Sequence, residues 1–370
     1  MTENTKNGDN SKLHNKRSTA RIMKSLDSTH RALNTMAILA FLLLLFLFYW
    51  YWTSDEFVTP AKIAEWSSHK TIVITGANSV VSFGVLVHLL RANTAEHIIM
   101  ACRSDTKCQA TLAQVQQHLG VTETTTSKVK VSLVSLDLTS RASIEQCAKS
   151  IIATAATTQQ QQSSISKLSK NMILVWNAND SVHDPIMVNG MGHLYLTHLL
   201  YPQLQRVVVA ASIVGGVPWD VLQPWEQSSY PSWFQLPAQY GTSKRTMLFL
   251  AQQLLLLQQS QSSQPQLQVV ATQAGLTCDE TEACHAISMT PIEGAHSHLR
   301  AMLDPDLQPG AYLGHRWILW GKTIIAGTLE SSWYHMHLSG ETRQQLWAWS
   351  LKELGIQEFG NNPSASTTTK

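Results

Sequence analysis

The sequence predicts an α/β protein whose centre is a doubly wound parallel sheet. Three observations predict this fold. From residue 70 onward, short runs rich in β-branched residues alternate with longer segments of helical length. The short runs are almost wholly apolar, as strands buried on both faces are. Hydrophobic residues make up 44% of the chain and charged residues only 14%, which favours a well-filled core over a disordered chain.

The expected elements follow one another in a regular strand–helix order. Buried strands are predicted at Thr71–Thr75, Ile98–Ala101, Val129–Leu136, Met172–Trp176, Arg206–Ala211 and Leu267–Ala271. Helices are predicted between them, near residues 83–92, 104–119, 140–155, 186–204 and 242–258. Because parallel strands need crossover connections of this length, the order itself favours a parallel sheet.

A long apolar segment, Met36–Trp52, precedes this pattern, and no charged residue occurs between Ala32 and Ser54. As a helix it would span roughly 25 Å, and aromatic residues gather at its C-terminal end as in an interfacial belt. A cleaved signal peptide would begin closer to Met1 and end in small residues, and a buried helix has no reason to be uniformly apolar. We therefore expect a single N-terminal transmembrane helix, with a membrane as partner.

The chain then divides into a flexible basic tail (1–35), the anchor (36–52), a linker (53–69), the main domain (70–350) and a polar tail (351–370). Basic residues precede the anchor while Asp55 and Glu56 follow it, which places the N-terminus in the cytoplasm by the positive-inside rule. The same basic tail also fits an organelle-targeting segment. The side of the membrane that holds the main domain stays open.

Composition excludes several classes of function. The formal net charge is only +2, so no overall basic field points to nucleic-acid binding. The five cysteines include no Cys-x-x-Cys pair, and their spacing predicts neither a disulfide framework nor a zinc site. His193 and His198 lie five residues apart, do not share a helix face, and are interpreted as packing or surface residues; no metal site is expected.

Tyr240 and Lys244 lie four residues apart at the start of a helical run, on one face and one turn apart. A nearby ammonium disfavours the neutral phenol, so we expect the pKa of Tyr240 to fall below its usual value of roughly 10. Such a phenol can exchange a proton with a substrate oxygen. Alone, the pair is common on surface helices, and the surrounding motifs decide its meaning.

Characteristic residues follow the predicted strands in a fixed order. The first strand leads into Thr75-Gly76-Ala77-Asn78-Ser79-Val80-Val81-Ser82. After the later strands come Arg103, Asp137, Asn177-Ala178, Ser212 and Gly275, with Asn189 in the helical segment between the fourth and fifth strands. This combination, over about residues 70–350, resembles the short-chain dehydrogenase/reductase family. Within it, the Asn-x-x-Gly-His-x-x-x-Thr pattern at residues 189–197 is typical of the membrane-anchored retinol-dehydrogenase and 3-ketosteroid-reductase-like branch.

The resemblance implies a Rossmann-type domain that transfers a hydride between NAD(P) and a lipophilic alcohol or ketone of sterol, retinoid or fatty type. It implies that Tyr240 is the general acid/base, that Lys244 tunes it and holds the ribose, that Ser212 bonds the substrate oxygen, and that Asn189 positions a relay water. The residues expected to bind cofactor are Gly76, Asn78, Ser79, Val81, Arg103, Asp137, Asn177, Ala178, Tyr240, Lys244 and Gly275.

Arg103 stands where an NAD-preferring enzyme would carry an acidic residue, so NADP(H) is expected over NAD(H). A surface charge is the competing interpretation of Arg103. The resemblance also makes the endoplasmic reticulum the default membrane and leaves a homodimer open.

The sequence departs from the family pattern on the cofactor side. Val80 and Ser82 replace the second and third glycines of the phosphate turn, and Trp176 and Asn179 replace the outer residues of Asn-Asn-Ala-Gly. A β-branched residue at the second glycine projects bulk towards the phosphates. An alternative function is therefore a fold-retaining protein with weak or no dinucleotide binding that serves as a lipid-binding or scaffolding module.

Overall fold

The computed structural model describes residues 33–47, 58–120, 128–161, 171–179, 184–212, 232–260, 267–275, 277, 289–315, 323–329 and 340–360. The chain forms two units, residues 1–55 and residues 56–370, which are considered separately.

In the first unit, residues 33–47 form a helix. Apart from the half-buried Leu47, its large apolar side chains keep between 46% and 67% of their surface exposed, on every side of the helix. None of the helices in the described part of the chain combines the length and the apolar character needed to cross a bilayer. The predicted tail over residues 1–32 and the end of the predicted anchor, residues 48–52, lie outside the described residues, so the transmembrane helix stays a prediction.

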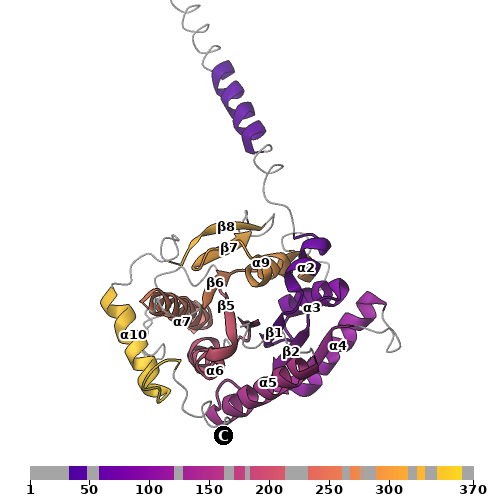
Figure 1. Cartoon of the computed structure of the whole chain (residues 1–370). Coiled ribbons are helices and arrows are strands. Elements are labelled where there is room, and N and C mark those ends of the chain that lie inside the picture. The colour runs from indigo at the N-terminus through magenta and orange to yellow at the C-terminus, as the bar shows by residue number, and fades with distance from the viewer. Residues whose placement is uncertain are drawn as a thin grey trace, which may run out of the picture. The chain divides into compact units, whose positions relative to one another are not determined.

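The second unit is an α/β domain around a sheet that has eight strands within the described residues, in the order β3-β2-β1-β4-β5-β6-β7-β8 (Figure 1). The first seven run parallel, as predicted for a Rossmann-type sheet, and β8 is antiparallel to β7. The strands are β1 (Thr71–Thr75), β2 (His97–Cys102), β3 (Lys130–Ser135), β4 (Met172–Trp176), β5 (Leu204–Ala210), β6 (Gln268–Thr272), β7 (Ala311–His315) and β8 (Thr323–Thr328).

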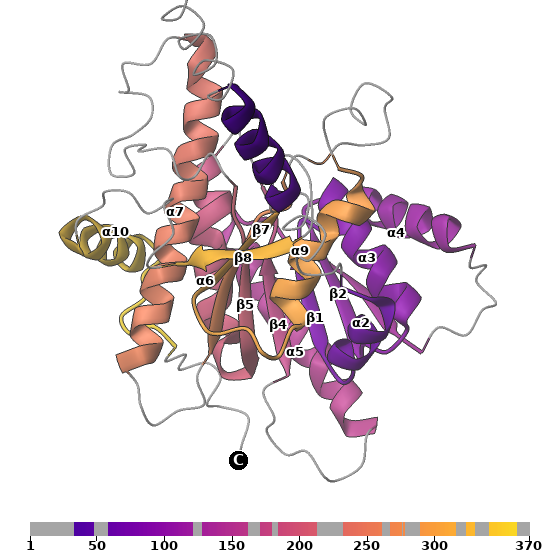
Figure 2. The ribbon, with the colours of Figure 1, turned by 90° about the horizontal axis from the view of Figure 1, so that it is seen from above.

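Helices cover both faces of the sheet (Figures 1 and 2). One face packs against α2 (Pro60–Ser67), α3 (Val80–Ala92), α4 (Asp105–Leu119) and α9 (Pro291–Leu303). The other packs against α5 (Arg141–Gln161), α6 (Gly192–Leu200) and α7 (Ser232–Ser260), and α10 (Gly340–Glu353) packs against α7.

Alternate residues of a strand supply the two cores, because successive side chains point to opposite faces. In β1, Ile72 and Ile74 join the core under α3 and α9, whereas Val73 joins the core under α6 and α7. All three are fully buried. This two-sided burial is why the central strands β1, β2 and β4 read as nearly unbroken apolar runs, whereas the edge strand β3, which is not fully buried, carries polar residues.

Local signals fix the helix starts near the C-terminal ends of the strands. The Ser79 hydroxyl accepts the backbone N–H of Ser82 and caps α3, and Ser104 caps α4 in the same way through Lys107. Gly84, in the second turn of α3, faces α9: a Cβ there would lie 2.0 Å from the Pro291 carbonyl oxygen. Gly84 therefore allows α3 and α9 to approach closely and does not take part in the phosphate turn.

The C-terminal part of the domain differs from the expectation. No element was predicted for β7, β8, α9 or α10. After α10, Leu354, Ile356 and Phe359 are buried in the core beside α6, and the Gly360 N–H donates to His198 Nδ1. The packed domain therefore extends to residue 360, beyond the expected boundary at residue 350.

Candidate active site

The predicted cofactor residues meet at the C-terminal edge of the parallel strands, where doubly wound sheets bind their ligands. Gly76 follows β1, Arg103 follows β2, Asp137 follows β3 and Ala178 follows β4. These four and Asn78 line one cavity of about 160 Å³, together with Ser104, Lys107, Leu136, Leu138, Asn179 and Val188. Residues far apart in sequence are thus gathered into a single concave site.

The turn after β1 requires glycine at its first position. Gly76 has φ of +58°, and a Cβ there would lie 2.5 Å from the Ala178 Cα. The Gly76 N–H donates to the Ala101 carbonyl at 2.8 Å, which ties the turn to β2. A backbone cradle of this kind is what a phosphate-bearing ligand needs near a helix N-terminus.

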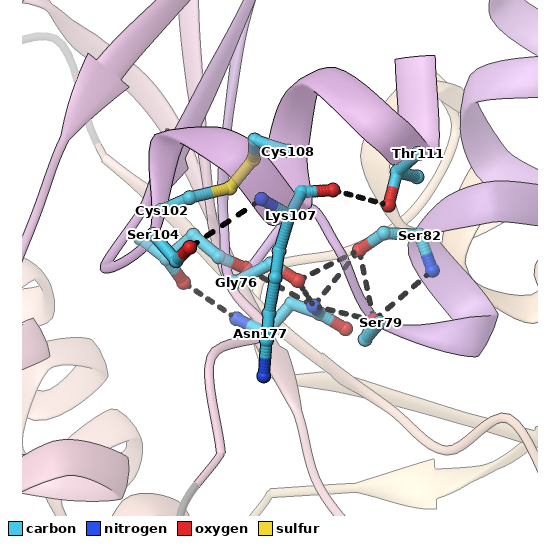
Figure 3. Close-up of a disulfide and its surroundings, with 10 residues drawn as sticks. Gly76, Ser79, Ser82, Cys102, Ser104, Lys107, Cys108, Thr111 and Asn177 are labelled. Atoms are coloured by element: carbon cyan, nitrogen blue, oxygen red, sulfur yellow. Dashed lines mark hydrogen bonds between the residues drawn. A yellow bond between two sulfur atoms is a disulfide. The ribbon is translucent and has the colours of Figure 1, made fainter. Parts of the chain in front are cut away.

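Serine hydroxyls occupy the interior of this turn (Figure 3). The Asn177 side-chain amide donates to Ser82 Oγ at 2.9 Å and to Ser79 Oγ at 3.1 Å, and it also reaches the Gly76 carbonyl at 3.1 Å. Ser79 Oγ and Ser82 Oγ lie 3.0 Å apart. Ser82, which replaces the third glycine of the family pattern, therefore takes part in a hydrogen-bond network behind the turn.

Val80 replaces the second glycine, and its side chain is partly exposed. It borders a second cavity, of about 640 Å³, which Asn78, Ser79, Phe83, Thr111 and Pro291 also line. Open space therefore remains beside the N-terminus of α3, and the valine does not fill it.

Three predicted cofactor residues take other positions. Asn177 is buried, and its side-chain amide donates hydrogen bonds to the turn. It therefore supports the turn and does not line the cavity. Val81 is half-buried and Gly275 follows β6 with φ of +69°, and neither lines the two cavities described above.

Two cationic side chains face the smaller cavity. Arg103 was predicted there, but Lys107, in the first turn of α4, was missed. The signal was the i, i+4 spacing of the two residues across the start of a helix. Asp137 lies on the same cavity, and its Oδ1 accepts both the N–H and the hydroxyl of Thr139 within its own turn.

Cys102 and Cys108 bracket this cationic segment and form a disulfide (Figure 3). Their Cα atoms lie 6.3 Å apart, within the range of disulfides, and both residues are buried. The spacing of the five cysteines, which lacks a Cys-x-x-Cys motif, did not predict this pairing. The pairing arises because α4 turns back over the end of β2, which the spacing alone does not reveal.

The four predicted catalytic residues gather around the first half of α7, which begins at Ser232, so Tyr240 and Lys244 lie within the helix and not at its start. Tyr240 forms a side-chain hydrogen bond with Ser212, at the end of β5. Lys244 Nζ lies 5.6 Å from the centroid of the Tyr240 ring and donates to the Ala210 carbonyl at 2.8 Å. Asn189 Nδ2 donates to Ser243 Oγ at 2.7 Å, which links it to the same helix.

Asn189 lies in a π-helix, Met187–Met191, that precedes α6. Such turns interrupt the regular hydrogen-bond ladder and recur at functional sites. Here the π-helix directs Val188 to the cofactor cavity and places Asn189 against α7. The π-helix therefore joins the two halves of the candidate site, which are the cofactor cavity and the proton-transfer residues around α7.

Burial dominates the electrostatics of the acid–base pair. Burial lowers the pKa of Lys244 to about 7, and it raises the pKa of Tyr240 against the opposing effect of the Ser212 hydrogen bond. The expectation that Lys244 would lower the pKa of Tyr240 is therefore wrong for the structure as it stands. Desolvation of the phenol outweighs a neighbouring amine whose own charge is disfavoured.

Comparison with known proteins finds partial sequence similarity to two kinds of dehydrogenase. Retinol dehydrogenase 13 from Homo sapiens is 27% identical over 197 residues, covering 50% of this chain and 53% of that protein. Dehydrogenase/reductase SDR family member 13 from Bos taurus is 32% identical over 156 residues, covering 39% of this chain and 36% of that protein. Over these stretches the chain is similar to short-chain dehydrogenases/reductases.

These matches are partial: the chain spans about half the length of the retinol dehydrogenase that it matches, and no family model matches it. Among solved structures, an uncharacterized protein from Mycobacterium paratuberculosis has a TM-score of 0.55 at 23% identity and covers 79% of this chain and 95% of its own. That likeness shows the fold.

Proposed function

We propose that this protein is an NAD(P)-dependent oxidoreductase that interconverts an alcohol and a carbonyl compound. Its homology to short-chain dehydrogenases/reductases implies this class of reaction on a CH–OH group. The observation that supports it best is the Tyr240–Ser212 hydrogen bond beside Lys244, at the strand edge that also holds the cationic cavity.

The residues fit a dinucleotide cofactor. Gly76 provides a turn that a Cβ would fill, and open space lies on both sides of Asn78. Arg103, Lys107 and Ser104 would hold the adenosine end. When bound, the nicotinamide ring supplies or accepts the hydride at the carbon of the reacting C–O bond.

The chain's own residues then handle the proton. In the direction of reduction, the Tyr240 hydroxyl donates its proton to the carbonyl oxygen, and Ser212 donates a hydrogen bond to the same oxygen as negative charge develops. The raised pKa of Tyr240 keeps the phenol protonated at neutral pH, ready to act as an acid. Lys244, whose pKa is lowered to about 7, is poised to replace that proton.

We propose NADP(H) as the preferred cofactor because two cationic side chains face the cavity. Arg and Lys form strong charge-assisted hydrogen bonds with phosphate oxygens. NADP(H) differs from NAD(H) by a 2′-phosphate, and Arg103 and Lys107 supply charge for it at the end of β2 and the start of α4.

The proposed setting is a membrane, with the endoplasmic reticulum as the default, and the proposed substrate is lipophilic. The support is the helix over residues 33–47, which exposes apolar side chains on every side, a pattern that calls for a nonpolar surrounding. A protein held at the bilayer would meet substrates dissolved in it. A homodimer is part of the proposal on family resemblance alone.

A turnover assay tests the proposed reaction. The full chain in detergent is given NADPH and a panel of retinoid, sterol and fatty carbonyl compounds, and the loss of NADPH absorbance is followed. Tyr240→Phe should abolish turnover and leave NADPH affinity nearly unchanged, because it removes only the transferred proton and its oxygen. Tyr195→Phe, on α6, is the control, since the Tyr195 hydroxyl bonds Glu145 away from this site. Turnover that survives in Tyr240→Phe would contradict the assignment.

The alternative, a lipid-binding or scaffolding module without dinucleotide binding, draws on Val80 and Ser82 in the phosphate turn. Two observations argue against this alternative: the Ser82 hydroxyl is hydrogen-bonded to Asn177, and open space lies beside Val80. It would be favoured if NADPH did not bind the chain and the double substitution Val80→Gly/Ser82→Gly restored binding.

A further inference from the structure

His193 lies between the two halves of the candidate site. It stands on α6, one turn after Asn189, and none of its surface is exposed. Its Nε2 lies 2.7 Å from Thr75 Oγ1, at the end of β1, and its Nδ1 lies 3.2 Å from the Asn189 backbone oxygen. The ring also stacks on Trp176, with ring centroids 5.5 Å apart.

The two contacts determine which ring nitrogen carries the proton. The Asn189 oxygen is a carbonyl and can only accept, so Nδ1 must be the donor. Burial, with a smaller effect from the Lys244 charge, lowers the pKa of His193 to about 3, so the ring holds a single proton at neutral pH. Nε2 is therefore an acceptor that faces the Thr75 hydroxyl at 2.7 Å, and it shares that proton with the Val175 carbonyl oxygen, which lies 2.9 Å from Thr75 Oγ1.

This assignment completes the bonding of Thr75. With its proton shared between Nε2 and the Val175 carbonyl oxygen, the Thr75 oxygen accepts the backbone N–H groups of Asn177 at 2.9 Å and Ala178 at 3.0 Å. Ala178 is the residue against which Gly76 packs most closely. The histidine thereby holds the hydroxyl that joins the ends of β1 and β4 behind the cofactor turn.

At its other nitrogen the ring holds the π-helix. Asn189 donates its side-chain amide to Ser243 on the helix of Tyr240 and Lys244, while its backbone oxygen is held by His193. A displaced Asn189 would disturb the proton-transfer residues through this bond.

We propose that His193 is a positioning residue whose ring, protonated at Nδ1, ties the cofactor turn at Thr75 to the π-helix that presents Asn189. The inference rests on the proposed oxidoreductase function. It assigns His193 no contact with substrate or cofactor, and the earlier interpretation of it as a packing residue is thereby extended to a role in the reaction.

Two half-conservative substitutions separate the two links. In His193→Asn the side-chain amide can still donate from the place of Nδ1, whereas the link to Thr75 is lost. In His193→Gln the longer side chain can still accept from Thr75, whereas the donor to Asn189 is lost. His193→Phe removes both links and keeps a ring to stack on Trp176.

The experiment measures NADPH affinity by fluorescence, and kcat and KM with the best carbonyl substrate of the panel, on the full chain in detergent. We expect His193→Asn to weaken NADPH binding about tenfold and to change kcat less. His193→Gln should lower kcat by ~10²-fold, the scale of a small misplacement of catalytic groups, and change NADPH affinity less. His193→Phe should show both losses.

Thr75 provides an independent check. Thr75→Val should weaken NADPH binding at least as much as His193→Asn does, because it also removes the acceptor of the Asn177 and Ala178 N–H groups. The double variant should be no worse than Thr75→Val alone, because the link to His193 is already broken there. Thr75→Ser keeps the hydroxyl and should restore affinity. His198→Asn, five residues along the same helix, keeps an acceptor for the Gly360 N–H and should leave affinity and kcat unchanged.

A spectroscopic readout does not depend on turnover. In ¹⁵N spectra of histidine-labelled protein, the His193 signal should show a protonated Nδ1 and an unprotonated Nε2 that do not titrate between pH 5 and 8. The opposite tautomer, or wild-type affinity and kcat in a folded His193→Phe variant, would overturn the inference. A wild-type chain that neither binds NADPH nor turns over would instead reject the proposed function.

Discussion

The cofactor turn and the proton-transfer set of this protein depart from expectation in opposite ways. The turn has lost two of its family glycines, yet Ser82 is bonded into the network behind it and Val80 leaves space beside it. The proton-transfer set keeps every expected residue, yet burial raises the pKa of Tyr240.

A motif and its environment therefore carry separate information. A substituted motif retains its shape when the new side chains find partners, and an intact motif changes its chemistry when it is buried.

The largest effect is expected at Gly76, where the turn tolerates no side chain. Gly76→Ala should destabilise the protein by on the order of 3 kcal/mol and abolish NADPH binding, because φ is +58° and the new Cβ would meet the Ala178 backbone. Gly120→Ala is the matched control: φ there is +64°, but nothing lies within 4 Å of the new Cβ. It should cost only about 1 kcal/mol. Equal losses of unfolding free energy in urea would contradict the close-approach argument.

The next largest effect is expected on NADPH affinity when a cation of the smaller cavity is removed. Lys107→Gln should weaken NADPH binding about tenfold at low salt and leave NADH binding nearly unchanged, since only NADPH carries the 2′-phosphate. Lys149→Gln, an exposed lysine on α5, is the control. If both cofactors weakened equally in Lys107→Gln, the lysine would have no role in selecting between them.

A buried lysine should make stability depend on pH. The folded-state pKa of Lys244, about 7, lies below its unfolded value of 10.5, so between these values the unfolded chain holds more protons. The free energy of unfolding should therefore rise from pH 7.5 to 9, with this group contributing at most about 1.4 kcal/mol per pH unit.

Lys244→Met should flatten this dependence, which urea unfolding at each pH measures. Burial lowers the pKa values of His97 and His193 to about 4 and about 3. Their titration therefore changes the free energy of unfolding only below about pH 6.5 and does not contribute to the slope between pH 7.5 and 9. A slope that persists in Lys244→Met would assign the effect to another group.

The smallest effect is expected in the turn's serine network. Ser82→Ala should cost about 1 kcal/mol, because it removes one partner of the buried Asn177 amide. Val80→Ala, at a partly exposed side chain, should stay within about 0.5 kcal/mol. Ser82→Gly, although it restores the family residue, should not improve NADPH binding. Improved binding would show that the serine obstructs the turn.

Sequence reasoning located the first six strands and five of the connecting helices, because their apolar runs are continuous and regularly spaced. It missed β7, which pairs with β6 at only two register positions and depends on the antiparallel β8 for support. The start of α9 could have been predicted from the sequence. Thr290 and Glu293 form a capping box, and Pro291 occupies the first helical position.

The candidate site was predictable as a set of residues and much less as a set of contacts. The strand-end positions of Gly76, Arg103 and Asp137 follow from the parallel order of the sheet. The bonds of Asn177 to the serines and of His193 to Thr75 depend on tertiary packing that no local pattern encodes. The raised pKa of Tyr240 is likewise a consequence of burial.

The central claim is that a dinucleotide still binds this turn beside the proton-transfer residues. Titration of the full chain in detergent with NADPH, followed by the cofactor's fluorescence, tests it most directly. We predict saturable binding that NADP⁺ displaces and that Arg103→Glu abolishes. An absence of saturable binding up to millimolar NADPH in a folded wild-type chain would contradict the claim.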